Sequence, residues 1–158
     1  MIESWPLARG DAAGSALLRC LPEDFVVCEE LGFVPDGEGE HRLLRLRKSE
    51  LNTADLAGRI AALCDVPLRD VGYCGLKDRN AVTTQWFSVG LAGRAEPNWC
   101  ALEDGGAVTV LETARHRRKL RRGVHRANRF ALTLREVRGE RAALEGRLES
   151  IRREGVPN

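Results

Sequence analysis

Asp78 is the residue of this chain whose neighbours most favour chemistry. It lies in the run Gly75-Leu76-Lys77-Asp78-Arg79, and positive charge close to a carboxyl group favours its ionised form. An ionised aspartate can act as a nucleophile, as a base or as a stabiliser of positive charge, but it has no proton to give as a general acid. Taken alone, the tripeptide Lys-Asp-Arg is more often a charged turn in solvent.

Two predicted strands flank this aspartate. Residues 70–74 and 85–89 are rich in side chains that suit a pleated sheet. A loop between strands is held by a rigid frame and is a frequent place for a reactive side chain. We therefore expect Asp78 to be presented on such a loop.

The other elements are predicted from apolar periodicity. Strands are expected over residues 25–29, 42–47 and 107–112, and in the alternating run Phe130, Leu132, Leu134. Helices are expected from Thr53, which can cap the first of them, to about Cys64, and from about Glu140 to Glu154. Because the strands follow one another more than they alternate with helices, the pattern predicts an α+β fold.

Composition sets the class of protein. A chain of 158 residues with 43% hydrophobic content can bury a core and predicts one domain or a large piece of one. The five cysteines include no Cys-x-x-Cys pair, which favours free thiols and argues against a metal site. Since no apolar signal segment and no apolar run long enough to span a bilayer occurs, we expect a cytoplasmic protein without a membrane partner.

Positive charge gathers in one segment. The formal net charge of +2 is too small to indicate nucleic-acid binding by itself, but residues 115–129 hold eight Lys or Arg and no Asp or Glu. Such a segment attracts a phosphate backbone, because neutralised phosphates release their counterions. A solvated cationic loop is the alternative. The residues expected to contact an RNA backbone are Arg115, Arg117, Arg118, Lys119, Arg121 and Arg122, and we expect Asp78 at the floor of the cationic groove that they form.

Asn128 and Phe130 follow this segment directly. An amide can pair with a base edge, and an aromatic ring can stack on an unstacked base of single-stranded RNA. The alternation of Phe130 with Leu132 and Leu134 equally favours burial of its ring in the core.

Residues 75–89 (GLKDRNAVTTQWFSV) closely resemble the signature of the tRNA pseudouridine synthase D family, which runs approximately Gly-x-Lys-Asp-(Lys/Arg)-His-Ala-x-Thr-x-Gln-Trp. Residues 22–27 (PEDFVV) and 32–41 (GFVPDGEGEH) are similar to the family's amino-terminal pattern. Residues 115–123 and Asn128-Arg129-Phe130 are similar to its basic segment and to the Asn-x-Phe that follows. The matches extend from about Arg19 to the end of the chain.

The resemblance implies isomerisation of uridine 13 of tRNA to pseudouridine, with Asp78 as the catalytic aspartate and with no metal or organic cofactor. It implies substrate contacts by Phe25, Asn128, Phe130, Lys77 and Arg19, with tRNA as the partner of a monomer. It also implies a mixed, largely antiparallel sheet with flanking helices. Residues 1–158 would be the amino-terminal part of the catalytic domain, because in the family the final Val-Pro-Asn leads into the rest of that domain and an inserted second domain.

Two residues depart from the family pattern. Asn80 occupies the place of a usual His, and an amide cannot change its charge near neutral pH. Arg19 occupies the place of a frequent Lys, which keeps the charge and changes its geometry.

The residues leave the mechanism and the activity of the short chain open. The carboxylate could attack C1′ or C6, stabilise positive charge at C1′, or remove a sugar proton. The target nucleotide must also leave its stack, which costs about a few kcal/mol. An inactive, RNA-binding remnant of such an enzyme is the alternative function, because a missing half would be needed to close the cleft. A phosphate-binding nucleotide enzyme is disfavoured, since no Gly-x-x-x-x-Gly-Lys-(Ser/Thr) loop occurs.

Overall fold

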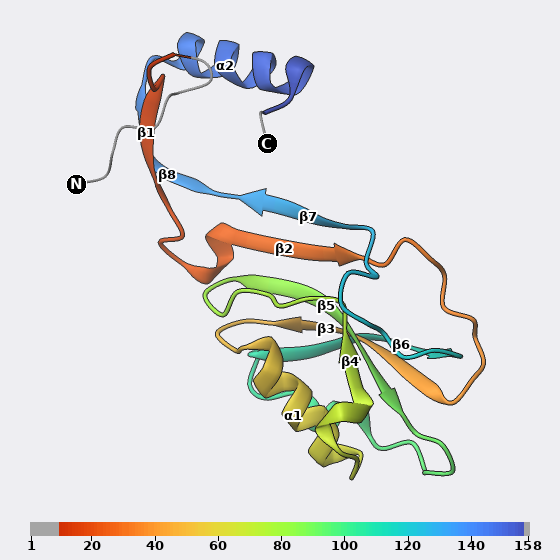
Figure 1. Cartoon of the computed structure of the whole chain (residues 1–158). Coiled ribbons are helices and arrows are strands. Elements are labelled where there is room, and N and C mark those ends of the chain that lie inside the picture. Colours follow the sequence, from red (N-terminus) through yellow and green to blue (C-terminus); the bar gives the residue numbers. More distant parts are fainter. Residues whose placement is uncertain (1–9, 157–158) are drawn as a thin grey trace. The chain divides into compact units, whose positions relative to one another are not determined.

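A computed structural model of the chain describes residues 10–156 (Figure 1). Residues Arg19–Thr133 form one compact unit. The described residues up to Leu18 and from Leu134 onward form a second unit. Every residue predicted to belong to the candidate site lies in the first of these units.

The larger unit is built on a six-stranded sheet. Its strands are β2 (Phe25–Glu30), β3 (His41–Lys48), β4 (Val71–Tyr73), β5 (Val82–Gly90), β6 (Val108–His116) and β7 (Ala127–Leu132). Their order is β6-β3-β5-β2-β7, and β4 pairs with β5. The β2 and β5 strands are parallel and the other neighbours are antiparallel. The predicted α+β fold with a mixed, largely antiparallel sheet is confirmed.

The central strand β5 carries apolar side chains to both faces of the sheet, because successive side chains of a strand point to opposite sides. Phe87 packs in one core cluster with Leu56 and Ile60 of the helix α1 (Thr53–Leu63). Trp86 packs in a second cluster that includes Leu120. Strand β5 and the loop before it are therefore fixed from both sides.

The helix α1 begins one residue earlier than its predicted cap implies. Asn52 holds the N-cap position and makes no side-chain capping bond, and Thr53 is the first helical residue. The prediction that Thr53 caps the helix is wrong because its hydroxyl group has other partners, namely Gln85 and the backbone N–H of Lys77.

Three short 3-10 turns, Pro22–Asp24, Leu68–Asp70 and Trp99–Leu102, connect the strands of the larger unit. The first turn leads directly into Phe25, and the second leads into β4. The predicted strand at residues 107–112 is longer than expected, because β6 continues into the basic segment as far as His116.

The smaller unit consists of a two-stranded antiparallel sheet and a helix. Strands β1 (Gly14–Leu18) and β8 (Leu134–Gly139) pair with each other, and α2 spans Arg141–Glu154. A side chain at Gly14 would lie 2.3 Å from the carbonyl oxygen of Arg138, so this pairing requires glycine there. The predicted single strand through Phe130, Leu132 and Leu134 is wrong, because it divides at Thr133 between the two units. No helix in the described part of the chain is long and apolar enough to cross a membrane.

Candidate active site

Asp78 lies on the loop between β4 and β5, as predicted. Its side chain is 53% exposed, and its Oδ2 atom accepts a hydrogen bond of 3.1 Å from Arg19 Nη2. A carboxylate with one oxygen held by a guanidinium and about half of its surface open can be reached by a substrate.

Arg19 joins this carboxylate to an aromatic ring. Its guanidinium carbon lies 3.8 Å from the centroid of the Phe25 ring, which is the geometry of a cation–π contact. The backbone of Arg19 has a φ of 60°, a left-handed conformation that few non-glycine residues adopt. The turn before Phe25 thus directs the guanidinium toward Asp78.

The two cations adjacent in sequence do not flank the carboxylate, and that expectation is wrong. Lys77 Nζ lies 2.6 Å from Glu29 Oε2, and Arg79 Nε donates to the carbonyl oxygen of Glu50 at 3.2 Å. Each side chain has its partner elsewhere, and Arg19, 59 residues away in sequence, contacts Asp78 instead.

A buried lysine holds the backbone of the loop. Lys48 at the end of β3 is 1% exposed, and its ammonium donates to the carbonyl oxygens of Leu51 at 2.7 Å, Asp78 at 3.1 Å and Lys77 at 3.5 Å. An ammonium has three donors and no acceptor, so three carbonyl groups satisfy it. Burial, followed by the neighbouring charge of Lys77, lowers the pKa of Lys48 to about 8.

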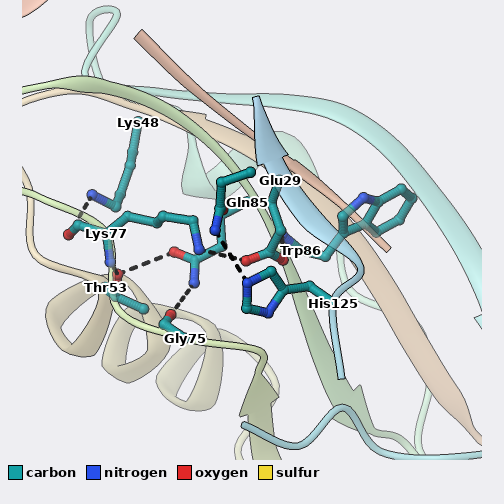
Figure 2. A network of polar contacts seen from close by, with 9 residues as sticks. Glu29, Lys48, Thr53, Gly75, Lys77, Gln85, Trp86 and His125 are labelled. Atoms are coloured by element: carbon teal, nitrogen blue, oxygen red, sulfur yellow. Dashed lines mark hydrogen bonds and ion pairs between the residues drawn. The ribbon is translucent and has the colours of Figure 1, made fainter. Parts of the chain in front are cut away.

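A chain of polar contacts links the loop to the middle of the sheet (Figure 2). The backbone N–H of Lys77 donates to Thr53 Oγ1 at 2.9 Å, and this hydroxyl donates to Gln85 Oε1 at 3.0 Å. Gln85 Nε2 in turn donates to the carbonyl oxygen of Gly75. The loop is therefore bound at Gly75, Lys77 and Asp78.

The ion pair of Lys77 and Glu29 lies next to this chain of contacts (Figure 2). Their side chains are 6% and 0% exposed, and Glu29 Oε1 also accepts from the backbone N–H of Trp86 at 3.1 Å. Burial, followed by the charge of Glu29, raises the pKa of the Cys74 thiol to about 12. Lys77, predicted to contact substrate, has its ammonium inside the protein beneath the loop.

Phe25 and Phe130 form an aromatic pair beside Arg19. Their centroids are 6.0 Å apart at an interplanar angle of 68°. Phe25 is 8% exposed and Phe130 is 56% exposed, because Phe130 lies on β7, whose only sheet neighbour in the described chain is β2. The sequence allowed either a ring that is free to stack on a base or a ring buried in the core, and in the structure the Phe130 ring is exposed.

Asn128 lies on β7 opposite Glu29. Its Nδ2 atom is 3.1 Å from His125 Nε2. Its Oδ1 atom is buried and has no hydrogen-bond partner among the described residues. An unpartnered buried carbonyl oxygen is costly and calls for a functional explanation.

The basic segment begins far from Asp78 and returns toward it. His116, near the start of the segment, is opposite His41 of β3, and His41 is opposite Gly90 at the end of β5. Asp78 lies at the other end of β5, before its first residue. His125, near the other end of the segment, lies 3.9 Å from the position that a Cβ atom on Gly75 would take, and Gly75 belongs to the same loop as Asp78.

A groove of about 870 Å³ follows the first part of the basic segment. We call it the basic groove; it is lined by Phe33, Val34, Asp36, His41, His116, Arg117, Arg118, Lys119, Leu120, Arg121 and Val124. Asp78 is not among these residues, so the expectation that it forms the floor of a groove made by the basic segment is wrong. Lys119 and Leu120 of the loop after β6 lie against Gly72 of β4 instead.

Some of the basic residues are paired by acids from other elements. Arg117 pairs with Glu38, Arg129 pairs with Glu30 at 2.8 Å, and Lys119 donates to the carbonyl oxygen of Arg69. Arg115, Arg118, Arg121 and Arg122 have no ion pair with any described residue. The unpaired charge expected from sequence is thus confined to part of the segment.

Sequence reasoning missed the buried residues that hold the loop, namely Glu29, Lys48, Thr53 and Gln85. A usable signal was present in β5, where the polar Gln85 stands in a run of buried residues. A polar group in such a strand requires a hydrogen-bond partner. Nothing in the sequence indicates that Lys48 is buried and holds the loop.

Comparison with known proteins adds family membership to this geometry. The model of the family described as tRNA pseudouridine synthase D (TruD) matches residues 8–158. A tRNA pseudouridine synthase D from Methylococcus capsulatus is 52% identical over 153 residues, which are 97% of this chain and 43% of that protein. One from Nitrosococcus oceani is 52% identical over 144 residues, which are 91% of this chain and 40% of that protein.

The fold is also found in a solved structure. A crystal structure of a Methanosarcina mazei protein, described as a tRNA pseudouridine synthase D, superposes on this chain with a TM-score of 0.80 at 24% sequence identity. The superposition covers 95% of this chain and 35% of that one. The chain spans about two fifths of the length of the curated relatives named here, and it belongs to the tRNA pseudouridine synthase D family.

Proposed function

We propose that a protein containing this chain isomerises uridine 13 of tRNA to pseudouridine, with Asp78 as the catalytic carboxylate. The observation that carries the proposal is the setting of Asp78. It is half exposed, held by Arg19, and carried on a loop whose backbone is fixed by a buried lysine. Family membership supplies the reaction and the class of substrate.

The isomerisation requires a carboxylate held still beside a nucleotide. The N-glycosidic bond breaks, the free base turns while it is retained, and C5 of the base joins C1′ of the ribose. Attack by Asp78 on C1′ or C6, stabilisation of positive charge at C1′, and removal of a sugar proton all need the carboxylate within reach of the ribose and base. The hydrogen bonds from Lys48 and the contact with Arg19 keep the reacting group in place, and positioning of this kind contributes strongly to rate.

The aromatic pair and Asn128 are the proposed contacts to the uridine. The exposed ring of Phe130 could stack on a base that has left its own stack. Phe25 is mostly buried and supports both Phe130 and Arg19. The Oδ1 atom of Asn128 is buried without a partner among the described residues, so it would accept a hydrogen bond from the N3–H group of uracil only after the side chain turns outward. Lys77 would act by fixing the loop and not by touching the substrate.

The proposal includes the organisation of the whole protein. Residues 1–158 would form the amino-terminal part of a catalytic domain, and the remainder would cover the base. A monomer in the cytoplasm with tRNA as its partner, and the absence of a cofactor, remain predictions. Arg115, Arg118, Arg121 and Arg122 are the proposed contacts to RNA phosphates, since they form no ion pair with any described residue.

The test compares two chains on unmodified tRNA. One is the 158-residue chain, and the other continues it with the carboxy-terminal sequence that its relatives have. Pseudouridine is located by carbodiimide modification and reverse transcription. We expect the extended chain to modify position 13 and the short chain to bind RNA without modifying it. Modification by the short chain would exclude the inactive remnant, and no modification by either chain would contradict the proposed activity.

A further inference from the structure

We propose that the basic groove binds an unpaired RNA nucleotide and its neighbouring phosphates at a second place, separate from Asp78. The choice of RNA as occupant rests on the proposed function. The groove itself is defined by its own residues, because neither Asp78, Arg19, Phe25 nor Phe130 lines it. Its volume of about 870 Å³ is at the upper end of the range of about 300–1,000 Å³ for small-molecule sites, which is room enough for a nucleotide.

One side of the groove is lined by an aromatic pair, in which the Phe33 ring is half-buried and the His116 side chain is 12% exposed. The rings of Phe33 and His116 are stacked, with centroids 5.1 Å apart and an interplanar angle of 20°. Val34 is 85% exposed and Val124 is 45% exposed at the same groove. Flat rings and exposed apolar side chains beside cations are the features on which single-stranded nucleic acids stack.

The loop that carries Phe33 is fastened to the end of β6. Asp36 Oδ2 lies 2.7 Å from His116 Nδ1 and accepts from the backbone N–H of Arg117 at 2.9 Å. The backbone N–H of Gly37 donates to the carbonyl oxygen of Arg115 at 3.1 Å. These bonds engage the carboxylate of Asp36 internally, so the one acid among the described residues that line the groove is already occupied.

The other side of the groove offers positive charge. Its lining includes Arg117, Arg118, Lys119 and Arg121 and the single carboxylate of Asp36. Arg118 and Arg121 have no ion pair among the described residues, so their guanidinium groups are open to a phosphate. Arginine binds phosphate oxygens through two parallel hydrogen bonds.

The backbone beneath these arginines is fixed before any ligand binds. Leu120 between them is 3% exposed, and its N–H donates to Ser88 Oγ at 2.9 Å. The N–H of Gly123 donates to the carbonyl oxygen of Cys74 at 2.8 Å. A preformed backbone lowers the entropic cost of binding, which distinguishes this surface from a mobile cationic loop.

The combination favours RNA over an acidic protein segment. Carboxylates of a peptide would satisfy the arginines, but they would offer no flat group to the part of the aromatic pair that lines the groove. A nucleotide uses both sides of the groove at once, with its base on the rings and its phosphates on the arginines.

The test measures binding of a fluorescent five-residue uridine oligonucleotide to the 158-residue chain by anisotropy over a series of salt concentrations. Phe33→Leu removes the ring and keeps an apolar side chain. Arg118→Gln with Arg121→Gln removes two charges. Arg59→Gln with Arg141→Gln is the matched control, because it removes the same charge from exposed ion pairs whose residues do not line the groove.

We expect Phe33→Leu to weaken binding about tenfold, as loss of one stacked base implies, with the salt dependence unchanged. The Arg118 and Arg121 pair should weaken binding and reduce the slope of log K against log salt by roughly 1.4, at about 0.7 per phosphate contact. The control pair should change both quantities less. Wild-type affinity in both groove variants, equal loss in the control, or stronger competition by a polyglutamate peptide than by RNA would overturn the proposal. Pseudouridine formation by the extended chain tests the catalytic proposal, and the comparison of groove variants with the control pair tests this one, so the failure of either is seen by itself.

Discussion

At the scale of single residues, the site depends on contacts between side chains that are distant in sequence. Arg19 lies between the carboxylate of Asp78 and the ring of Phe25. Sequence reasoning could identify all three residues through the resemblance to a family. It assigned the wrong cations to Asp78, because adjacency along a loop does not decide which way Lys77 and Arg79 point.

Replacing Arg19 should reduce the rate more than the affinity for tRNA. In the extended chain, Arg19→Met frees the carboxylate of Asp78 from its partner, and we expect kcat to fall by roughly tenfold to a hundredfold, since displacement of a reacting group by about 1 Å costs about that much. Single-turnover pseudouridine formation measures the effect. Arg19→Lys keeps the charge without the planar group, so its kcat should lie between those of the wild type and Arg19→Met. A rate equal to wild type in Arg19→Met would show that this contact is dispensable.

Lys77 should matter for stability, because its partner is buried. Lys77→Met leaves the carboxylate of Glu29, which is 0% exposed, without its cation, and loss of one partner of a buried pair costs about 3–5 kcal/mol. The free energy of unfolding in urea measures this loss. Adding Glu29→Gln removes the unpaired charge and keeps an acceptor for the N–H of Trp86, so the double variant should be more stable than Lys77→Met alone. Equal stability of the two variants would contradict the role given to the ion pair.

At the scale of elements, the loop after β4 is held by residues of β3, α1 and β5. Lys48 binds its carbonyl groups, and Thr53 and Gln85 bind its backbone near Lys77 and Gly75. The loop was expected to be held by the two strands that flank it. In the structure, buried polar contacts from three elements hold it in addition to those strands.

The pKa of Lys48 predicts a pH dependence of stability. In the folded chain this pKa is lowered from 10.5 to about 8, so between these pH values the unfolded chain binds more protons at this residue. The contribution of Lys48 to the free energy of unfolding therefore rises with pH across this window. Comparing urea unfolding of wild type and Lys48→Met from pH 7.5 to 10.5 isolates the effect, since other groups titrate in both chains. Parallel pH dependences would contradict it.

Phe130 on the edge strand should separate activity from stability. Because its ring is 56% exposed, Phe130→Ala should change the free energy of unfolding by less than about 1 kcal/mol. Loss of a stacking partner worth about 1–3 kcal/mol should lower kcat/KM of the extended chain by roughly tenfold to a hundredfold. Leu132→Ala, half exposed on the same strand, is the matched control and should change kcat/KM little. A similar loss in both variants would mean that the strand, and not the ring, is important.

The elements themselves could largely be predicted from sequence. Apolar periodicity located α1, α2 and the strands β2 to β6 to within a few residues, because side chains of β5 and α1 that face the core recur at the expected spacing, but it predicted neither β1 nor β8. It could not find the division of the chain at Thr133, since the alternation of Phe130, Leu132 and Leu134 continues across it. The pairing of β1 with β8 depends on contacts more than 100 residues apart in sequence, which a local pattern does not contain.

At the scale of the whole molecule, the proposed site is spread over distant parts of one sheet. Asp78 and Phe25 lie near the start of β5, and the basic groove lies near the end of that strand. The proposed functions of these two places differ, because the reaction is assigned to Asp78 and binding of an RNA nucleotide is assigned to the groove. The chain spans 43% of the length of its relative from Methylococcus capsulatus, and the proposal assigns the complete reaction to the longer protein.

The most direct measurement is pseudouridine formation in tRNA by the extended chain with Asp78→Asn, together with the Kd of the variant for the same tRNA. The amide preserves the size of the side chain and removes the charge that the isomerisation requires. We expect no detectable pseudouridine at position 13 and a Kd within about twofold of wild type, because phosphate contacts lie elsewhere. Pseudouridine formation by Asp78→Asn at the wild-type rate would contradict the central claim.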